Sequence, residues 1–422
     1  WSLAAYSALA WAAQPLLRRK LRRRAQAEPG YGESVEERFG RYAPADLGRD
    51  GAGHWVWVHA VSLGETRAAA LLIAELRVAL PGMRLLLTNG TATGRAEGRK
   101  LLQPGDLQVW QPWDSTQAVR RFLRQFRPAV GVLMETEIWP NLIDQCQRLN
   151  VPLYLVNARL SERSAKGYAK LQRLVRPAFA GLSRIAAQTA DDARRLSEVG
   201  ANQPLVCGNI KFDVAPPLDL DQQRARLVSL LGENRQVLLW ASTREGEEAP
   251  LLDAFLQLQW PDNLLLLVVP RHPQRFEEVA NQISQRGLSL QKRSAGLPIA
   301  ANTRVVLGDS MGEMFAYFSV ANVAIIGGSI QPLGGQNLIE ACAVGTPVLF
   351  GPHMFNFAEA SRLALEAGAA QQAESALDLL TQAHALLLDP SRQKQMGAAG
   401  VAFAQSHRGA TQRIIDLLPD LH

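Results

Sequence analysis

The sequence predicts an α/β protein of two parallel-sheet domains, and three observations support this. From His54 onward, short apolar segments alternate with amphipathic helical segments, the order typical of a parallel sheet covered by helices. The alternation is interrupted once, at 214–221 (VAPPLDLD), where Pro216 and Pro217 indicate a linker. The chain has 422 residues, which is enough for two domains with complete cores.

Strands are expected where the short apolar runs occur. In a first domain, 25–214, helices are expected at 67–80 and 115–126 and strands at 54–61, 84–88, 130–134, 153–156, 185–188 and 205–208. In a second domain, 222–422, strands are expected at 237–241, 264–269, 303–307, 323–326 and 347–350. Ligands of open α/β sheets bind at the carboxyl ends of the strands. The polar residues that follow these runs are therefore candidates for a site, and the two domains are expected to face a cleft.

The N-terminus combines an apolar stretch with a basic one. Residues 1–17 carry no charge, and six basic residues follow: Arg18, Arg19, Lys20, Arg22, Arg23 and Arg24. As a helix, the apolar stretch would be roughly 25 Å long, against a hydrocarbon core of about 30 Å. A signal peptide carries its positive charge before the apolar stretch, not after it. The order here predicts a membrane anchor at 1–24, spanning with the main body cytoplasmic or lying in the interface. A core helix is the alternative, but it would seldom end in six cations.

The basic charge is concentrated in the first half of the chain. Residues 1–214 carry 30 Lys and Arg against 19 Asp and Glu, whereas 215–422 carry 15 against 20. The first domain is therefore expected to meet an acidic partner. Nucleic acid is not favoured as this partner, because no basic stripe interleaved with aromatic residues follows the six basic residues at 18–24. The three scattered cysteines, Cys146, Cys207 and Cys342, give neither a disulfide framework nor a zinc spacing.

A glycine-rich segment follows the expected strand 323–326. It reads GGSIQPLGGQNLIE from Gly327 to Glu340, with a helix expected to start at about Gln336. Glycines let backbone approach a ligand, and a helix N-terminus offers free N–H groups to a phosphate. Glu340 could accept hydrogen bonds from ribose hydroxyls. A turn that only packs a strand on a helix is the alternative, and the paired glycines with polar Gln336 and Asn337 favour the phosphate.

Cations follow two other expected strands. Arg271 and His272 come directly after LLLLVVP, and Lys211 is the cation of GNIKFD. Charges at a strand end can be a solvated edge, but a guanidinium there also suits a phosphate or a base edge. Neither signal is specific alone.

Carboxylates follow two strands of the first domain. Glu65 sits in VSLGETRAAALL, where a first-turn carboxylate can cap a helix or take a proton from an acceptor hydroxyl; spacing leaves both open. Glu135 and Glu137 lie in METEIWPN, where two carboxylates need partners in an apolar setting. Arg159 and Arg163 are candidates to pair with them, or to bind an anionic acceptor.

Several familiar motifs are missing from the sequence. It contains no GxxxxGK[ST] or HExxH pattern, and its one DxD, Asp219 to Asp221, falls in the linker. The sequence therefore predicts no metal site and favours metal-independent chemistry.

Taken together, these residues resemble the 3-deoxy-D-manno-octulosonic acid (Kdo) transferases of lipopolysaccharide synthesis, nearly end to end. The ordered blocks are ERFGRY (37–42), HAVSLGET (59–66), METEIWPNL (134–142), NARLSERSAKGY (157–168), GNIKFD (208–213), STREGEE (242–248), VPRHPQRF (269–276), GDSMGEM (308–314), GGQNLIEA (334–341) and GPHMFNF (351–357).

The resemblance implies a GT-B fold of two Rossmann-like domains, with CMP-Kdo as donor and no cofactor. The implied acceptor is the tetraacylated lipid A precursor (lipid IVA) at the bacterial inner membrane, with the catalytic domains on the cytoplasmic side. The resemblance makes Glu65 the general base of an inverting transfer, with Glu135 and Lys211 assisting at the transition state. It places CMP against Pro270, Arg271, Met311, Gly312, Glu313, Asn337, Leu338, Ile339 and Glu340.

A nucleotide-sugar epimerase, or a membrane-docked module that only binds sugar nucleotides, is the alternative class. An epimerase needs neither an acceptor nor a membrane segment. Only a transferase makes a heavier lipid from CMP-Kdo and the lipid A precursor.

Overall fold

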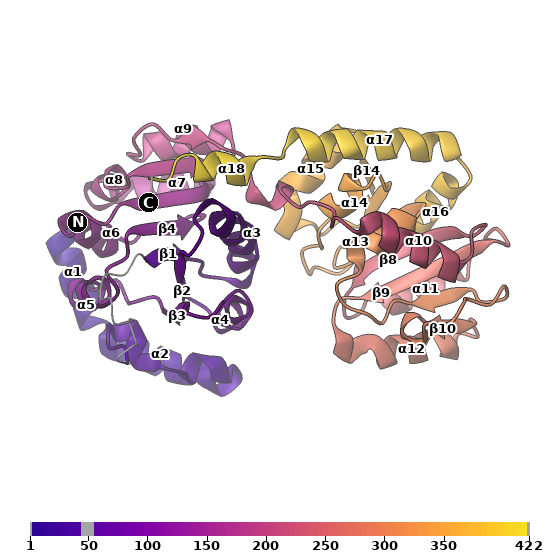
Figure 1. Ribbon diagram of the computed structural model, residues 1–422, viewed down its shortest axis with the longest axis horizontal. Coiled ribbons are helices and arrows are strands. Elements are labelled where there is room, and N and C mark those ends of the chain that lie inside the picture. Colours follow the sequence, from indigo (N-terminus) through magenta and orange to yellow (C-terminus); the bar gives the residue numbers. More distant parts are fainter. Residues whose placement is uncertain (1, 44–54, 420–422) are drawn as a thin grey trace. The chain divides into compact units, whose positions relative to one another are not determined.

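The computed structural model describes residues 2–43 and 55–419. The chain divides into two compact units, Trp1–Asp213 with Arg408–His422, and Val214–His407 (Figure 1). The boundary after Asp213 coincides with the start of the predicted linker. Trp1 of the predicted anchor, His54 of the first predicted strand and residues 420–422 of the predicted second domain lie outside the described residues.

Each unit is built on a fully parallel seven-stranded sheet. The first has the order β3-β2-β1-β4-β5-β6-β7 and the second β10-β11-β9-β8-β12-β13-β14. The first sheet consists of β1 Trp55–His59, β2 Arg84–Asn89, β3 Leu107–Trp110, β4 Val130–Met134, β5 Leu153–Ala158, β6 Arg184–Ala187 and β7 Leu205–Val206. The second consists of β8 Gln236–Thr243, β9 Leu264–Pro270, β10 Leu290–Lys292, β11 Val305–Leu307, β12 Val323–Ile326, β13 Val348–Phe350 and β14 Ala370–Gln372.

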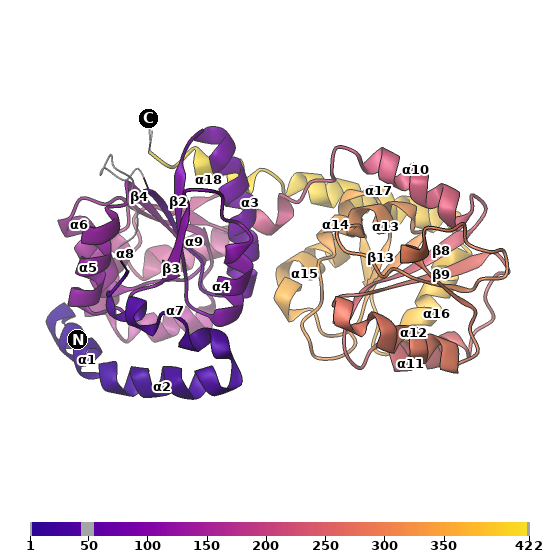
Figure 2. The same cartoon turned by 60° about the horizontal axis from the view of Figure 1, so that its bottom comes forward.

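Helices cover the sheets, as the alternating pattern predicts (Figures 1 and 2). The first unit carries α1 Leu3–Ala12, α2 Gln14–Ala27, η1 Pro29–Gly32, η2 Val35–Phe39, α3 Leu63–Ala79, α4 Ala92–Arg99, α5 Thr116–Phe126, α6 Pro140–Arg148, α7 Glu162–Ala169, α8 Gln172–Ala180, α9 Ala190–Glu198, η3 Ile210–Phe212 and α18 Ala410–Ile415. The second carries α10 Leu220–Leu231, α11 Glu248–Phe255, η4 Pro273–Arg275, α12 Phe276–Gln285, η5 Arg293–Ala295, α13 Met314–Val320, α14 Ile339–Ala343, η6 Phe355–Phe357, α15 Ala358–Glu366, α16 Ala376–Leu387 and α17 Pro390–Ser406.

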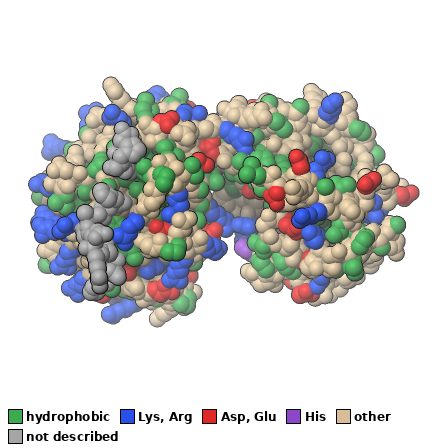
Figure 3. All heavy atoms as spheres, in the orientation of Figure 1, with side chains coloured by type: hydrophobic (Ala, Val, Ile, Leu, Met, Phe, Trp, Pro, Cys, Tyr) green, Lys and Arg blue, Asp and Glu red, His purple; other side chains and the backbone are tan. Residues whose placement is uncertain are grey.

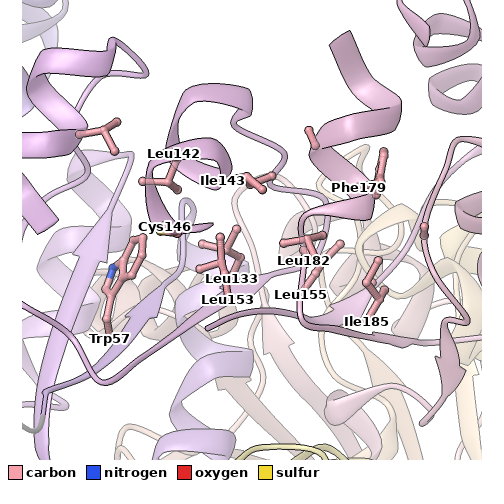
Figure 4. Close-up of a cluster of buried hydrophobic side chains, with 14 of the residues drawn as sticks. Trp57, Leu133, Leu142, Ile143, Cys146, Leu153, Leu155, Phe179, Leu182 and Ile185 are labelled. Carbon is pink, nitrogen blue, oxygen red and sulfur yellow. The ribbon is translucent and has the colours of Figure 1, made fainter. Parts of the chain in front are cut away.

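Alternate side chains of each central strand feed two cores on opposite faces of the first sheet. Trp55 and Trp57 of β1 belong to one buried cluster, whereas Val56 and Val58 belong to the other, because successive side chains of a strand point to opposite faces. Figure 4 shows part of the first cluster, in which Trp57 lies with side chains of β4, β5, α6 and α8. A strand buried on both faces explains why the run WVWVH shows no polar alternation.

The C-terminus corrects the predicted second domain, which was drawn to residue 422. Residues 408–422 belong to the first unit, where α18 packs against α3 and buries Ala410 and Ile414 in its core (Figure 1). Asp213 holds the start of this helix: its carboxylate accepts the backbone N–H groups of Gly409 and Thr411 at 2.6 and 2.5 Å. The second unit is therefore an insertion in the first.

The predicted anchor is two helices rather than one. α1 ends at Ala12 and α2 begins at Gln14, with Pro15 in the first turn of α2, because proline is tolerated there and not inside a helix. The basic residues lie within α2, and no side chain of either helix is buried. Two hydroxyls dock α1 on the unit: Tyr6 donates to Asp114 at 2.9 Å and Ser7 to Asn141 at 2.6 Å.

The ERFGRY block (37–42) begins in η2 and packs against the edge of the first sheet. Arg38 is buried, with its guanidinium 3.8 Å from the centre of a Trp110 ring and its Nη2 donating to Gly90 O at 3.0 Å. Burial lowers the pKa of Arg38 to about 10. Glu37 accepts from Trp110 N at 2.8 Å and pairs with Arg95 at 3.1 Å. This block is therefore structural in the first unit.

Candidate active site

The candidate residues of the first unit lie at the point where its strand order reverses. β2 and β3 lie on one side of β1, and β4 on the other. Helices that leave neighbouring strands on opposite faces open a crevice there, where ligands of such sheets bind. Glu65 follows β1, and Glu135 and Glu137 follow β4.

Glu65 occupies the first turn of α3 and takes part in capping it. Ser62 is the N-cap, and its hydroxyl accepts from Glu65 N at 3.3 Å and donates to Glu65 Oε1 at 2.9 Å. Glu65 Oε2 accepts from Val61 N at 2.9 Å. This is a capping box, and its S-x-x-E spacing is visible in the sequence. The helix-cap interpretation is confirmed for Glu65, and it leaves the carboxylate partly exposed.

Glu135 turns the chain sharply at the end of β4. Its φ of 58° is left-handed, a backbone conformation that is costly for any residue other than glycine. Glu135 N donates to Val156 O at 2.9 Å, and Arg159 Nε donates to Glu135 Oε2 at 3.0 Å. Of the two predicted partners, the structure pairs Arg159 with this carboxylate.

Glu137 lies in the same loop and meets a histidine that sequence reasoning missed. Trp139 Nε1 donates to Glu137 Oε2 at 2.7 Å, and His59 Nε2 lies 4.0 Å from the same oxygen. His59 is fully buried, and its Nδ1 lies 3.1 Å from Thr88 O. Within the described part of the chain, Nε2 has no hydrogen-bond partner. A histidine inside an apolar strand gives no signal in the sequence that separates it from a core residue.

Glu65 and Glu137 both have raised pKa values. Burial raises the pKa of Glu65, an effect that the charge of Glu135 increases and the bonds from Val61 and Ser62 oppose. Burial raises the pKa of Glu137 to about 7, with the charges of Glu65 and Glu135 adding to it. Burial lowers the pKa of His59 to about 3, so that this imidazole is neutral. A carboxylate with a raised pKa is a stronger proton acceptor near neutral pH.

Lys211 is presented by the short helix η3, which packs against α3. Two asparagines hold this loop: Asn209 Oδ1 accepts from Lys211 N at 3.0 Å, and Asn157 Oδ1 accepts from Ile210 N at 3.1 Å. Asn157, the last but one residue of β5, has a left-handed φ of 51°. The loop with Lys211 and the helix with Glu65 in its first turn therefore pack against each other.

The second unit repeats this placement at its own reversal, where β8 lies between β9 and β12. The loop 244–247 follows β8, and the loop that starts at Gly327 follows β12. Glu247, which sequence reasoning did not single out, ties the two together. Its buried carboxylate accepts three backbone N–H groups, from Arg244 at 2.9 Å, Gly328 at 2.6 Å and Ile330 at 3.0 Å.

The glycine pairs lie where other parts of the protein come close to the backbone, and the approach of a ligand to them stays a prediction. A Cβ on Gly327 would come within 2.3 Å of Ser242 O, and one on Gly335 within 2.3 Å of Met354 Sδ. Gly328 and Gly335 both have positive φ, and Gly335 N donates to Gly328 O at 2.7 Å. The two pairs therefore fold the segment 327–335 into a closed loop.

The helix predicted to start at about Gln336 starts later, at Ile339, and is only five residues long. The side chain of Asn337 delays it, because its Oδ1 accepts from Ile339 N at 3.0 Å, the local bond that competes with helix formation. Asn337 Nδ2 also donates to Glu340 Oε1 at 2.9 Å. Leu338 and Ile339 are fully buried, so that their side chains belong to the core.

Arg271 lies near Glu340 at the end of β9. Burial raises the pKa of Glu340, and the Asn337 amide and the Arg271 charge oppose that rise. Arg271 N donates to Thr243 O at 3.0 Å, which joins the chain after Pro270 to the loop after β8. Arg271, Asn337 and Glu340 are thus close together, and their role in binding a nucleotide stays a prediction.

Met311, Gly312 and Glu313 lie in the loop between β11 and α13, beside β9 in the sheet. Met311 is exposed, and Gly312 has a φ of 82°. Glu313 accepts from Tyr317 OH at 3.1 Å and from Arg293 Nη2 at 3.0 Å. The carboxylate of this loop is therefore held by its own neighbours.

Arg275 and Glu248, two further charged residues of the blocks STREGEE and VPRHPQRF, are structural. Arg275 and Glu248 form a buried ion pair with Nη1 and Oε1 2.6 Å apart, and Thr243 Oγ1 donates to the same oxygen at 2.7 Å. Their side chains are 5% and 1% exposed. In the sequence these residues look like members of a polar loop, and only the structure shows that they are core.

The described residues hold no cluster of three or more His, Cys, Asp or Glu placed to bind a metal ion. Over the same residues, no helix is both long and apolar enough to cross a membrane. Five of the six basic residues of α2 are exposed, and so are Leu9, Trp11 and Leu16 beside them. Figure 3 shows Lys and Arg side chains at many points on the visible face of the first unit.

Comparison with known proteins identifies the family. Residues 33–214 match the family model described as 3-deoxy-D-manno-octulosonic-acid transferase (kdotransferase). The chain is 47% identical to the 3-deoxy-D-manno-octulosonic acid transferase of Bordetella pertussis, over 90% of this chain and 91% of the relative. It is 34% identical to the enzyme of the same name from Haemophilus influenzae, over 98% and 97%.

A solved structure shows the same fold at much lower identity. The UDP-GlcNAc 2-epimerase from Neisseria meningitidis, bound to UDP-GlcNAc, matches with a TM-score of 0.56 and 16% identity, over 86% of this chain and 99% of that one. Two parallel-sheet α/β units of this kind are consistent with the GT-B fold of glycosyltransferases. On the sequence identities, the chain belongs to the 3-deoxy-D-manno-octulosonic acid transferase family and is a glycosyltransferase.

Proposed function

We propose that this enzyme transfers Kdo from CMP-Kdo to a hydroxyl of the tetraacylated lipid A precursor, with inversion, without a metal, and with Glu65 as general base. The observation that carries the proposal is the placement of Glu65. It lies at the strand-order reversal of the first sheet, with a raised pKa and two further carboxylates beside it, in a chain of the Kdo transferase family.

In the proposed step, Glu65 removes the proton of the acceptor hydroxyl while its oxygen attacks the anomeric carbon of Kdo. The bond from that carbon to the phosphate oxygen breaks, and CMP leaves with the electron pair. The new bond forms on the opposite face, which inverts the configuration. Partial exposure gives Glu65 access to a substrate, while Ser62 and Val61 fix its direction.

Glu135 and Lys211 are proposed to assist at the transition state. Glu135 is fixed by its turn and by Arg159, and Lys211 by the asparagines beneath its loop. Fixed charges stabilise developing charge without reorganisation, which is where an enzyme gains most over water.

The donor is proposed to bind the second unit. Arg271 suits the phosphate of CMP, and Asn337 and Glu340 suit hydroxyls of its ribose. Pro270, Met311, Gly312 and Glu313 lie in loops at the same end of the sheet. Leu338 and Ile339 contribute through the backbone, since their side chains are buried. CMP leaves with one phosphate, so that a cation such as Arg271 can stabilise it.

The acceptor and the membrane are proposed to meet the first unit. This half of the chain carries the excess of positive charge, and the acceptor is a bisphosphorylated lipid. Exposed Leu9, Trp11 and Leu16 next to exposed arginines of α2 suit a helix at a lipid interface. We place the enzyme at the inner membrane with its catalytic units on the cytoplasmic side.

A mixing assay tests the reaction itself. Purified enzyme, CMP-Kdo and the lipid A precursor should give a lipid heavier by one or more Kdo units, seen by mass spectrometry. An epimerase would alter the sugar nucleotide and leave the lipid unchanged, and that outcome would refute the proposal. If transfer stopped when a chelator was added, the claim that the reaction needs no metal would be wrong, and the rest of the proposal would stand.

Glu65→Ala tests the base. Transfer should fall by at least about 100-fold, the range for loss of a general base, while CMP affinity stays at the wild-type value. The matched control is Glu75→Ala, because Glu75 is an exposed carboxylate of the same helix. Near-normal turnover of Glu65→Ala would show that another group takes the proton. Glu137→Gln then decides whether the neighbouring carboxylate is that group.

Arg271→Ala tests the donor site. CMP binding, measured by calorimetry, should weaken by about 10-fold or more, the effect of one charge-assisted contact. Arg362→Ala is the control, since Arg362 is an exposed arginine of the same unit in a surface pair. An Arg271→Ala protein with wild-type CMP affinity would place the phosphate elsewhere.

Flotation with vesicles tests the membrane contact. The enzyme should bind vesicles that contain anionic lipid, and binding should weaken at high salt because the contact is partly electrostatic. A double variant, Leu9→Ser and Trp11→Ser, should bind less tightly at every salt concentration. Equal binding by both proteins would exclude α1 as the contact.

A further inference from the structure

The donor implied by the proposed function carries two anionic groups on one carbon. The anomeric carbon of Kdo bears the phosphate of CMP and also the carboxylate of the sugar. A site for this donor therefore has two neighbouring anionic groups to bind, whereas a neutral sugar on the same CMP group would present only the phosphate. Arginine is the side chain that suits both groups, because its planar fork binds carboxylate and phosphate in a bidentate way.

Two arginines follow adjacent strands at this edge of the second sheet. Arg244 follows β8, Arg271 follows β9, and the two strands are parallel neighbours. Arg271 N donates to Thr243 O at 3.0 Å, which places Arg271 beside the residue that precedes Arg244. Both charges act on the same histidine: after burial, Arg244 is the largest cause of the lowered pKa of His272, and Arg271 contributes too.

Arg244 also lies over the glycine-rich loop. A Cβ on Gly328 would lie 3.5 Å from Arg244 Cγ and 3.3 Å from Gln336 Nε2. The backbone of Arg244 is fixed by Glu247, which accepts from Arg244 N at 2.9 Å and from Gly328 N at 2.6 Å. The arginine and the loop are therefore positioned by one buried carboxylate.

The present partner of Arg244 is a carboxylate that a ligand could replace. Arg244 Nε donates to Glu245 Oε2 at 3.1 Å, and the Glu245 side chain is 55% exposed. Exposed pairs of this kind contribute little. The other arginines near this edge are committed to the fold, since Arg275 is buried between Glu248 and Glu278 and Arg293 pairs with Glu313.

We infer that Arg244 binds the carboxylate of the Kdo residue in CMP-Kdo, in place of Glu245, and so selects an acidic sugar over a neutral one. The inference rests on the proposed function and adds the residue that recognises the sugar acid. Arg271 remains the contact of the phosphate.

The test separates the sugar acid from the nucleotide by comparing two ligands. Arg244→Ala should raise the KM for CMP-Kdo by about 10- to 100-fold, the effect of losing one charge-assisted contact. Its inhibition constant for CMP, which lacks the carboxylate, should stay within about 2-fold of wild type. Arg244→Lys keeps the charge but not the planar fork, so its KM for CMP-Kdo should lie between those of wild type and Arg244→Ala. Arg362→Ala should match wild type.

Three outcomes would overturn the inference. Equal weakening of CMP and CMP-Kdo would assign Arg244 to the nucleotide or to the shape of the loop. An unchanged KM in Arg244→Ala would remove it from the site. A raised KM for CMP-Kdo in Glu245→Gln would show that Glu245 holds Arg244 in place. If Glu245 only competes with the sugar carboxylate, its removal should not weaken the binding of CMP-Kdo.

Binding without turnover keeps this test independent of the proposed reaction. Calorimetry with CMP-Kdo and with CMP, each alone, compares the two ligands on wild type and Arg244→Ala. If the mixing assay failed to give a heavier lipid, the proposed transfer would be wrong. A carboxylate-dependent loss of affinity in Arg244→Ala would still stand.

Discussion

Glu247→Gln is the sharpest test of how the second unit shapes its glycine-rich loop. The carboxylate accepts three N–H groups, two of them on Oε2 and one on Oε1. A glutamine has one acceptor oxygen, so that at least one N–H loses its bond and faces an NH₂ group. Each charge-assisted bond of this kind contributes about 1.5–3 kcal/mol.

Burial reduces the expected loss. It raises the pKa of Glu247 in spite of the three N–H groups, which shows that the ionised carboxylate is itself disfavoured there. The net destabilisation of the second unit should therefore be near the lower end, about 2 kcal/mol. Because Gly328 and Ile330 lose their anchor, CMP affinity should fall by about 10-fold.

Calorimetric unfolding of the full chain, with the transitions of the two units fitted separately, measures the first effect, and titration with CMP measures the second. Glu366→Gln is the control, because it removes an exposed carboxylate from a surface pair in the same unit and should change stability by less than about 0.5 kcal/mol. If Glu247→Gln unfolded like wild type and bound CMP equally well, the three hydrogen bonds to the Glu247 carboxylate would contribute neither to stability nor to CMP binding.

Three further predictions concern the first unit. Glu137 has a folded pKa of about 7 against its ordinary 4.5, so it takes up a proton on folding, and wild-type stability should fall as the pH rises from about 4.5 to 7. In Glu137→Gln, the loss of unfolding free energy between pH 5 and pH 7.5 should be smaller than in wild type by up to about 3 kcal/mol. Unfolding at both pH values measures this difference, and an equal loss in both proteins would contradict the prediction. Tyr6→Phe removes the bond to Asp114 and should speed amide exchange in α1 by about 5-fold with α3 unchanged, whereas equal exchange in both proteins would show that the bond does not hold α1. Asp213→Ala should destabilise the unit by about 1–2 kcal/mol, as loss of a helix cap does, and open residues 408–419 to protease; continued protection would mean that apolar contacts alone hold α18.

The central strands could be predicted from the sequence because a strand buried on both faces is a continuous run of apolar residues. The run 130–134 became β4 and 323–326 became β12 without change, since each is uniformly buried. The edge strands β3, β10 and β14 were missed. They are only three or four residues long and none is buried along its whole length, as in LQK of β10, so they carry neither a long apolar run nor a clean alternation.

The site could be predicted as a set of strand ends but not as a set of contacts. The sequence places Glu65, Glu135 and Arg271 after their strands, and it offers Arg159 as a partner for a carboxylate. It does not show that His59 faces Glu137 or that Glu247 binds the backbone of Gly328. Those contacts join residues of different strands, and their geometry depends on how the sheet is ordered.

The return of the chain to the first unit affects how this protein is made. The first unit needs Ala410 and Ile414 to complete its core, and it receives them only when the ribosome has finished the 194 residues of Val214–His407. The inserted unit, in contrast, is complete in one continuous stretch and can fold first. A fragment that stops after Asp213 would leave an apolar face of α3 open, whereas one spanning 214–407 lacks nothing of its own core. The unit that carries Glu65 therefore completes its core only after the inserted unit has been made.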